Sequence, residues 1–167
     1  GEPIAAKVVA DLISNAYVKR VHLLDLHNTS IPGFFAIPTH HHSPIELFKE
    51  YIKKNLDLKH AIVVSPDFGG LKRARVLADE LNLDLVNVDK HRNLHTGKVT
   101  PMGISGDVAN KICLIYDDII NTGSTVVEVS KFLKQHKAKE VHFLVTHGVF
   151  AGNGLTLMTD ESINSIV

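Results

Sequence analysis

The sequence has little cysteine, no surplus of either charge and no long apolar run, and each shortage excludes a class of protein. Its 167 residues include one cysteine, Cys113, which excludes a disulfide-bonded framework and fits a reducing cytoplasm. Lysine and arginine number 18, as do aspartate and glutamate, so the composition gives no reason to expect binding to nucleic acid or to a membrane surface. No apolar run approaches the roughly 20 residues needed to span a bilayer.

Apolar and polar segments alternate along the chain in a way that is typical of an α/β fold. With 44% hydrophobic residues, the chain has enough apolar surface for the core of one domain and part of a second. The pattern predicts helices at 2–16, 45–55, 71–81 and 124–136, and strands at 21–26, 61–64, 84–89, 111–116, 140–147 and 162–167. This alternation predicts a mostly parallel sheet with helices on both faces.

The most informative segment is CLIYDDIINTGST, residues 113–125. We expect an apolar strand to end at Asp117 and Asp118, and open α/β sheets bind ligands at such strand ends. Paired carboxylates suit sugar hydroxyls or a hard cation such as Mg²⁺, and the following turn offers N–H groups and hydroxyls to a phosphate. The simpler alternative is that the acids only end a strand and a hydroxyl caps a helix. The candidate phosphate-binding residues are Asn121, Thr122, Gly123, Ser124 and Thr125.

A second segment, VVSPDFGGLKRAR at residues 63–75, again joins a buried strand to a helix through a short loop. Its two glycines permit unusual backbone angles and leave N–H groups open to a ligand. An ordinary turn between strand and helix is the alternative. The candidate loop residues are Asp67, Phe68, Gly69 and Gly70.

Two further segments carry side chains suited to metal or phosphate binding. DLHNTSIPGFFAIP, residues 25–38, places His27 after a strand, where a neutral imidazole can ligate a metal or serve as a structural hydrogen-bonding group. VDKHRNLHTGKV, residues 88–99, places Lys90 and Arg92 where a strand gives way to a polar loop. Two cations on a mobile loop are suited to closing over phosphates, although a solvated basic loop has the same composition.

Histidine is frequent, and three of the eleven form the run His40-His41-His42. Three consecutive histidines raise the alternative of a zinc site, but no matching set of cysteine and histidine accompanies them. We expect the run to lie in an exposed polar loop.

The segment with the acid pair resembles the 5-phosphoribosyl-diphosphate binding motif, which phosphoribosyltransferases and ribose-phosphate pyrophosphokinases share. The other three segments resemble the pyrophosphokinases, which move a pyrophosphoryl group from Mg²⁺–ATP to ribose 5-phosphate in nucleotide biosynthesis. This resemblance runs along essentially the whole chain. It implies a phosphoribosyltransferase-like α/β fold, Mg²⁺ as cofactor, ATP and ribose 5-phosphate as partners, a cytoplasmic location and a homo-oligomer.

The resemblance also assigns roles to the candidate residues. It implies that the acid pair addresses the ribose hydroxyls and that loop 121–125 holds the 5-phosphate. It assigns loop 67–70 to the transferred pyrophosphoryl group, with His27 and Asp67 at the Mg²⁺ site. The lysine and arginine of the fourth segment correspond to catalytic residues that stabilise the transferring group.

The resemblance further implies a domain organisation. Because family members carry an additional N-terminal portion, we expect residues 1–43 to end a first domain and residues 44–167 to form a C-terminal catalytic domain, incomplete at its C-terminus. Asn121 stands where the family usually has aspartate, and Ala36 replaces an acid. These departures keep open a non-catalytic regulatory or assembly subunit of the pyrophosphokinase type. A phosphoribosyltransferase is the other alternative.

Overall fold

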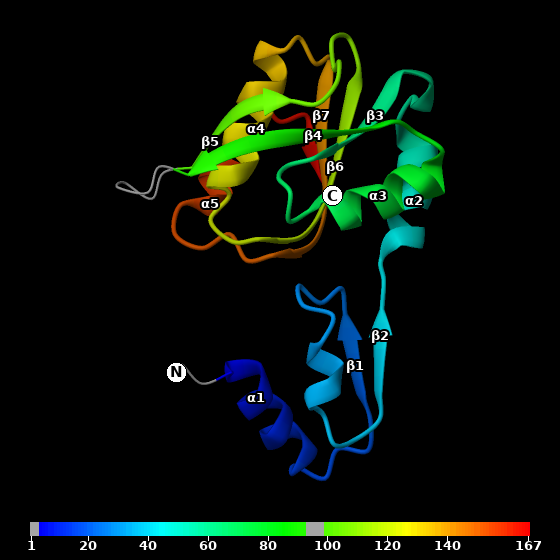
Figure 1. Ribbon diagram of the computed structural model, residues 1–167, viewed down its shortest axis with the longest axis vertical. Coiled ribbons are helices and arrows are strands. Elements are labelled where there is room, and N and C mark those ends of the chain that lie inside the picture. Colours follow the sequence, from blue (N-terminus) through cyan, green and yellow to red (C-terminus); the bar gives the residue numbers. More distant parts are fainter. Residues whose placement is uncertain (1–3, 93–98) are drawn as a thin grey trace. The chain divides into compact units, whose positions relative to one another are not determined.

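The chain forms two compact units, Gly1–Pro44 and Ile45–Val167, in a computed structural model that describes residues 4–92 and 99–167 (Figure 1). The surroundings of side chains are described for residues 4–89 and 103–167. Within the described ranges, every helix is too short or too polar to cross a membrane.

The first unit combines one helix with a two-stranded parallel sheet. Its elements are α1 (Ala5–Ser14), β1 (Val21–Leu24), the 3₁₀ helix η1 (Ile31–Phe34) and β2 (Thr39–His42). The strands pair in register from Val21 with Thr39 to Leu24 with His42. The end of α1 is held to the segment after η1, because the N–H of Ala36 donates to the Ser14 hydroxyl over 3.3 Å.

The histidine run forms strand β2, so the prediction of a polar loop is wrong at these residues. Pairing with β1 explains the difference, because the backbone of β2 is satisfied by a strand nearly 20 residues away in the sequence. The side chains of the run are exposed, as expected. The ring of His22 stacks with those of His40 and His42, and its Nδ1 lies 2.8 Å from the His42 Nε2.

The second unit is a six-stranded sheet with the order β5-β4-β3-β6-β7-β8. All neighbouring strands are parallel except β4 and β5, which are antiparallel. The strands are β3 (Ala61–Ser65), β4 (Leu85–Arg92), β5 (Val99–Ile104), β6 (Ile112–Ile120), β7 (Glu140–Gly148) and β8 (Ser165–Ile166). The helices are α2 (Ile45–Asn55), η2 (Leu58–His60), α3 (Leu71–Leu81), α4 (Ser124–Gln135) and the short α5 (Gly154–Leu157).

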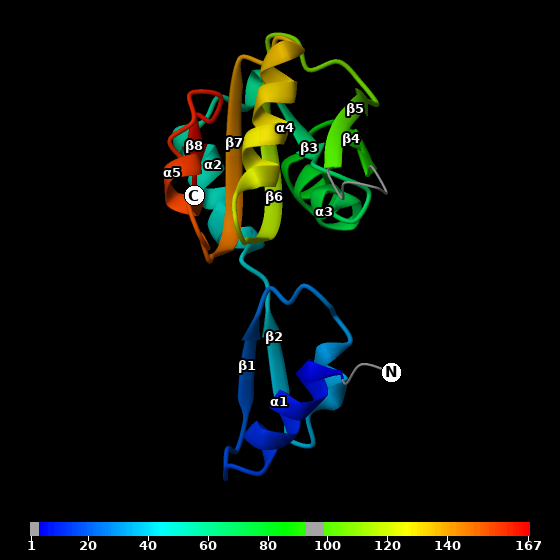
Figure 2. The same cartoon turned by 90° about the vertical axis from the view of Figure 1, so that its left-hand side faces the viewer.

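Helices cover both faces of this sheet, which confirms the predicted fold class (Figures 1 and 2). On one face, Phe48 of α2 and Leu77 of α3 pack with Leu114 of β6 in one buried cluster. On the other face, Val129 of α4 packs with Phe143 of β7 in a second cluster. The sheet is therefore buried on both sides, as the wholly apolar strands predict.

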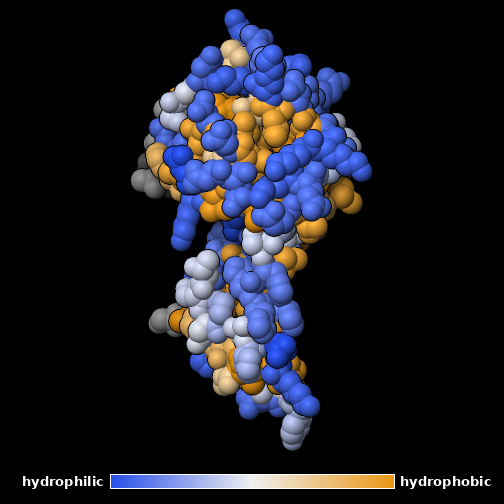
Figure 3. All heavy atoms as spheres, turned by 90° about the vertical axis from the view of Figure 1, so that its right-hand side faces the viewer, coloured by the Kyte–Doolittle hydropathy of each residue, from blue (hydrophilic) through white to orange (hydrophobic). Residues whose placement is uncertain are grey.

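The outer sides of α2 and α3 carry both apolar and charged side chains. Leu47 and Val76 are exposed on these helices, and Figure 3 shows apolar atoms gathered in the middle of this face of the second unit with hydrophilic atoms around them. The Lys49 ammonium of α2 lies 2.9 Å from Glu46 and 2.6 Å from Glu80 of α3, so the two helices are linked across their exposed edges.

Two strands are longer than the sequence predicts. The structure extends β6 to Ile120, so Asp117 and Asp118 lie inside the strand and do not end it. The reason is the long parallel partner β7, whose Gly148 pairs with Ile120. Strand β4 likewise continues to Arg92, because it pairs with β5, an antiparallel strand that the sequence analysis did not predict.

Candidate functional site

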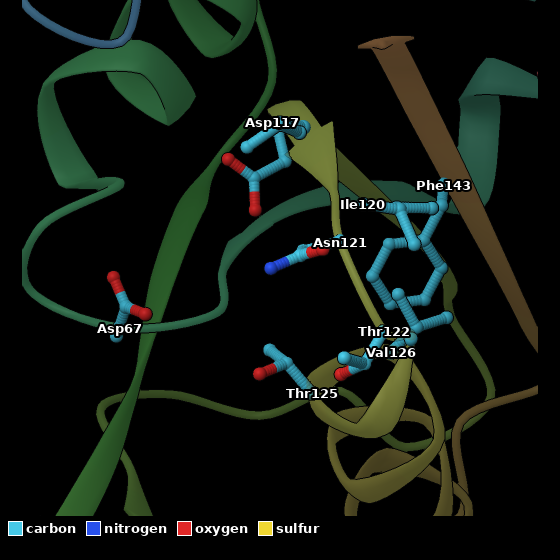
Figure 4. A pocket seen from close by; sticks show the side chains of 10 residues that line it. Asp67, Asp117, Ile120, Asn121, Thr122, Thr125, Val126 and Phe143 are labelled. Atoms are coloured by element: carbon cyan, nitrogen blue, oxygen red, sulfur yellow. The ribbon is translucent and has the colours of Figure 1, made fainter. Parts of the chain in front are cut away.

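The candidate site is a pocket in the second unit at the carboxyl ends of two adjacent strands, β3 and β6 (Figure 4). Because these strands are parallel neighbours, the loops that follow them meet at the same edge of the sheet. The lining residues are Asp67, Asp117, Ile119, Ile120, Asn121, Thr122, Gly123, Thr125, Val126 and Phe143. The polar groups of Asp67, Asp117, Asn121 and Thr125 point toward a common space.

The two acids of β6 differ in exposure, although both lie close to the same cation. The side chain of Asp117 is 31% exposed and lines the pocket, whereas that of Asp118 is 2% exposed. The Arg73 guanidinium of α3 lies between them, with Nη1 at 3.5 Å from Asp117 Oδ1 and Nη2 at 3.2 Å from Asp118 Oδ2. The guanidinium also lies over the Tyr116 ring, 5.6 Å from its centroid.

The electrostatics of the acid pair favour one retained proton. Burial raises the pKa of Asp117 from its ordinary 3.8 to about 7, and the neighbouring Asp118 carboxyl adds to the rise. The charge of Arg73 and the N–H that Asp118 donates to Asp117 Oδ1 over 2.9 Å both oppose it. A cation or several hydroxyl donors in the pocket would favour the charged form of Asp117.

The loop 121–125 joins β6 to α4 in a conformation suited to an anion. Gly123 has φ +83° and is the N-cap of α4, so the chain enters the helix through the left-handed region. A Cβ at Gly123 would lie 2.3 Å from the Cε of Met158. The hydroxyls of Thr122 and Ser124 lie 3.2 Å apart at the same helix end. The N-terminal N–H groups of a helix, with hydroxyls beside them, form an anion-binding site.

A segment that the sequence analysis did not assign holds this loop in place. The N–H of Val149 donates to the carbonyl of Ile120 over 2.9 Å, and the N–H of Ala151 donates to that of Asn121 over 2.8 Å. The chain leaving β7 is thereby tied to the start of the loop.

The loop after β3 is folded around its own aspartate. Asp67 Oδ1 accepts from the N–H of Gly70 over 2.9 Å, and the Ser65 hydroxyl donates to the Asp67 carbonyl over 2.7 Å. Gly70 is the N-cap of α3, and a Cβ at Gly69 would lie 3.3 Å from Asp67 Oδ1. Asp67 thus shapes the turn and also lines the pocket, so the loop can be both a turn between strand and helix and part of a binding site.

The structure brings six of the predicted site residues together around the pocket: Asp67, Asp117, Asn121, Thr122, Gly123 and Thr125. Within the described part of the chain, the remaining predicted loop residues and Asp118 are not among those that line it. Phe68 is largely exposed.

Three predicted residues lie outside this description of the pocket. His27 belongs to the first unit, where it is exposed, and the pocket belongs to the second. The backbone of Lys90 and Arg92 lies in β4 and not in a loop, which corrects the prediction. Their side chains lie outside the described residues, as do residues 93–98 entirely.

The sequence analysis missed Arg73, which contacts both acids. A signal for it exists, because two adjacent carboxylates near a core require a cation. Arg73 lies one helical turn before the buried Leu77, beside the face of α3 that packs on the sheet.

The donors around the pocket fit Mg²⁺ in chemical type. No three histidine, cysteine, aspartate or glutamate side chains of the described residues are grouped as metal ligands. Magnesium is usually held by one or two carboxylates together with water and substrate phosphates, and Asp67 and Asp117 supply two carboxylates at one pocket.

Comparison with known proteins agrees with this geometry. The model of the phosphoribosyl transferase domain family matches residues 39–166. A ribose-phosphate pyrophosphokinase of Mycoplasma pneumoniae is 45% identical over 90% of this chain and 46% of its own length. One from Aquifex aeolicus is 41% identical over 99% of this chain and 53% of its own length. The chain therefore spans about half the length of the curated relatives it matches.

Solved structures share the fold of this chain. The phosphoribosylpyrophosphate synthetase of Mycobacterium smegmatis superposes with a TM-score of 0.88 at 32% identity, over 99% of this chain and 53% of that one. A purine phosphoribosyltransferase of Pyrococcus horikoshii, at 21% identity and a TM-score of 0.54 over 80% of this chain and 87% of that one, shares the fold. The chain belongs to the phosphoribosyl transferase domain family, and the curated relatives that it matches are named ribose-phosphate pyrophosphokinases.

Proposed function

We propose that this chain carries the ribose 5-phosphate site of a ribose-phosphate pyrophosphokinase. The reaction transfers the pyrophosphoryl group of ATP to ribose 5-phosphate, giving 5-phosphoribosyl 1-diphosphate and AMP. The observation that carries the proposal is the pocket in which a carboxylate, a second acid-bearing loop and a helix N-terminus meet at one sheet edge. The names of the relatives at 41–45% identity supply the reaction.

The pocket suggests where ribose 5-phosphate binds. The phosphate of ribose 5-phosphate accepts hydrogen bonds from the N–H and hydroxyl groups of loop 121–125, which leads into the N-terminus of α4. Its ring hydroxyls donate to the Asp117 carboxylate, which lines the same pocket. Loop 67–70 then faces the anomeric end of the sugar and receives the pyrophosphoryl group through its open backbone.

The chemical step is an in-line displacement at phosphorus. The anomeric oxygen forms a bond to the β-phosphorus of ATP and loses its proton. The bond from the β-phosphorus to the oxygen that it shares with the α-phosphorus breaks, and AMP leaves with the electron pair. Asp67 would hold Mg²⁺ at the pocket, with His27 as the second predicted ligand, and the ion would supply positive charge to the phosphates. Lys90 and Arg92 stabilise the charge that develops on the transferring group, since this reaction depends on positioning and positive charge.

The proposal extends to the whole protein. We propose that residues 1–43 end an N-terminal domain and that residues 44–167 belong to a C-terminal catalytic domain. We assign the rest of the ATP site to the portion of a longer protein that corresponds to the unmatched half of the relatives, a proposal that follows from the resemblance. We also propose a homo-oligomer in the cytoplasm, a location consistent with the single buried cysteine.

The first test is AMP release from Mg²⁺–ATP by this chain, with and without ribose 5-phosphate, beside calorimetric binding of the sugar phosphate. Wild type should bind ribose 5-phosphate, and Asp117→Asn should weaken that binding by about tenfold or more, because a charged acceptor becomes a neutral amide. Asp79→Asn, an exposed aspartate of α3, is the matched control and should behave as wild type.

The possible results separate the candidate functions. Sugar-dependent AMP release supports the full reaction in this chain. Binding of ribose 5-phosphate that depends on Asp117, without AMP release, supports the sugar-phosphate site and shows that AMP release needs more than this chain. Absence of any ribose 5-phosphate binding to the folded chain would contradict the proposal.

A further inference from the structure

Arg73 is the cation that the pocket's acid pair shares, although it is not among the residues that line the pocket in the described chain. Its two terminal nitrogens reach different acids, Nη1 to Asp117 at 3.5 Å and Nη2 to Asp118 at 3.2 Å. Its side chain is 18% exposed, so most of it is removed from solvent. One guanidinium therefore bridges a buried carboxylate and a carboxylate that faces the ligand.

The position of Arg73 is fixed from several sides. Its helix is anchored by Ala74 and Leu77, which are buried to 0% exposure against the sheet. Its guanidinium lies over the Tyr116 ring, and that ring packs edge-on against Phe48 at 5.4 Å. A planar guanidinium held on an aromatic face has little freedom to rotate, so its two donors keep a fixed direction toward the acids.

Burial makes this arrangement energetically important. Asp118 is 2% exposed, and a carboxylate removed from water in this way is strongly destabilising without a partner cation. Asp117 is its chain neighbour and would be repelled by an unneutralised Asp118. Removing Arg73 is therefore expected to alter both acids together, and the Asp117 carboxyl would no longer be held in a fixed direction at the pocket.

We propose that Arg73 is a positioning residue for sugar-hydroxyl recognition, with Asp118 as its buried anchor and Asp117 as the carboxylate that it holds toward the ligand. This inference rests on the proposed ribose 5-phosphate site and assigns a separate role to each of its residues. Asp117 contacts the sugar hydroxyls, Asp118 does not, and loop 121–125 binds the phosphate independently of Arg73.

The division predicts a selective loss. Arg73→Ala should weaken ribose 5-phosphate binding by about tenfold or more, because one partner of a buried charge pair is lost. The affinity of Arg73→Ala for inorganic phosphate should stay within about twofold of wild type, because the phosphate loop leads into α4, whereas Arg73 belongs to α3. Arg73→Lys keeps the charge but loses the planar fork, so it should recover part of the sugar affinity.

The test is calorimetric titration of the full chain with ribose 5-phosphate and, separately, with inorganic phosphate. Circular dichroism checks that each variant is folded. Arg75→Ala is the matched control, since Arg75 is an exposed arginine two residues along the same helix. A general structural defect would weaken the binding of both ligands, whereas a positioning defect weakens only the binding of ribose 5-phosphate.

Each result decides the proposal. Ribose 5-phosphate binding that is unchanged in Arg73→Ala, or equal loss of both ligands in the folded variant, overturns it while the proposed function stands. If Arg73→Ala does not fold, Asp118→Asn takes its place: selective loss of the sugar phosphate supports the anchor role, and unchanged binding overturns it. If wild type binds no ribose 5-phosphate, the proposed function fails and this inference fails with it.

Discussion

Asp117 and Asp118 are neighbours in the sequence, yet they differ in exposure. Because β6 continues to Ile120, both acids lie inside the strand, where Asp117 lines the pocket and Asp118 is buried to 2% exposure. The sequence predicted an acid pair at the site, but it could not predict this asymmetry. That required the length of β6, which depends on its pairing with β7.

Gly123 is the residue at which backbone conformation matters most for the loop. At φ +83°, an alanine would be strained whatever the space around it, and its Cβ would meet only the flexible end of the Met158 side chain. We expect Gly123→Ala to lower the free energy of unfolding by about 1–2 kcal/mol and to weaken phosphate binding. Urea unfolding and phosphate titration measure the two effects.

A matched glycine serves as the control for this prediction. Gly33 has open space around an added Cβ and no positive φ, so Gly33→Ala should change stability by less than about 0.5 kcal/mol. Equal effects of the two substitutions would show that the left-handed turn at Gly123 is unimportant.

At the scale of elements, local signals predicted helices better than strands. The bounds of α2 and α3 agree with prediction, because their apolar residues recur at helical spacing. Strands β2 and β5 were missed, since a histidine run and a segment with Pro101 and Gly103 lack the apolar signal of a strand. Both strands are formed by pairing with a partner, which local sequence does not encode.

Helix α3 links the core to the site, so its packing can be tested by itself. Leu77 is 0% exposed in the cluster between α2, α3 and the sheet, whereas its neighbour Val76 is 44% exposed. Leu77→Ala should lower the free energy of unfolding by about 2–5 kcal/mol, because it removes buried apolar atoms and leaves a cavity. Val76→Ala should cost less than about 0.5 kcal/mol.

Urea unfolding at fixed pH measures this difference. Similar costs for the two variants would mean that α3 does not pack on the sheet through the face that contains Leu77. The result also bears on Arg73, which that packing holds beside the acids.

At the scale of the whole molecule, the rule for parallel sheets predicted much of the site. Because such sheets bind ligands at strand ends, the sequence was sufficient to predict Asp67 and loop 121–125 as site residues, each after an expected strand. It was insufficient for Arg73, which reaches the acids from a helix, and for the 149–151 segment that holds the loop. Such contacts depend on packing between elements distant in the sequence.

The pH dependence of stability is a whole-molecule consequence of the acid pair. In the folded chain the pKa of Asp117 is raised from 3.8 to about 7, so between about pH 4 and pH 7 the folded state binds more protons than the unfolded state. The contribution of Asp117 protonation to the free energy of unfolding is fully present below pH 4 and is lost as pH rises through 7. Asp117→Asn has no such proton to lose, so its free energy of unfolding relative to wild type should increase as pH rises across this window. The increase should be on the order of 1–2 kcal/mol, because solvent at the pocket screens part of the effect.

Urea unfolding of both proteins at several values between pH 4.5 and pH 8, in buffer without Mg²⁺, measures that difference. Asp79→Asn controls for the loss of one carboxylate from an exposed position of α3. The other titrating groups, including eleven histidines, are common to wild type and both variants and cancel in the comparison. A constant difference between Asp117→Asn and wild type over the whole range would show that Asp117 is already ionised near pH 4, and that Arg73 outweighs both burial and Asp118.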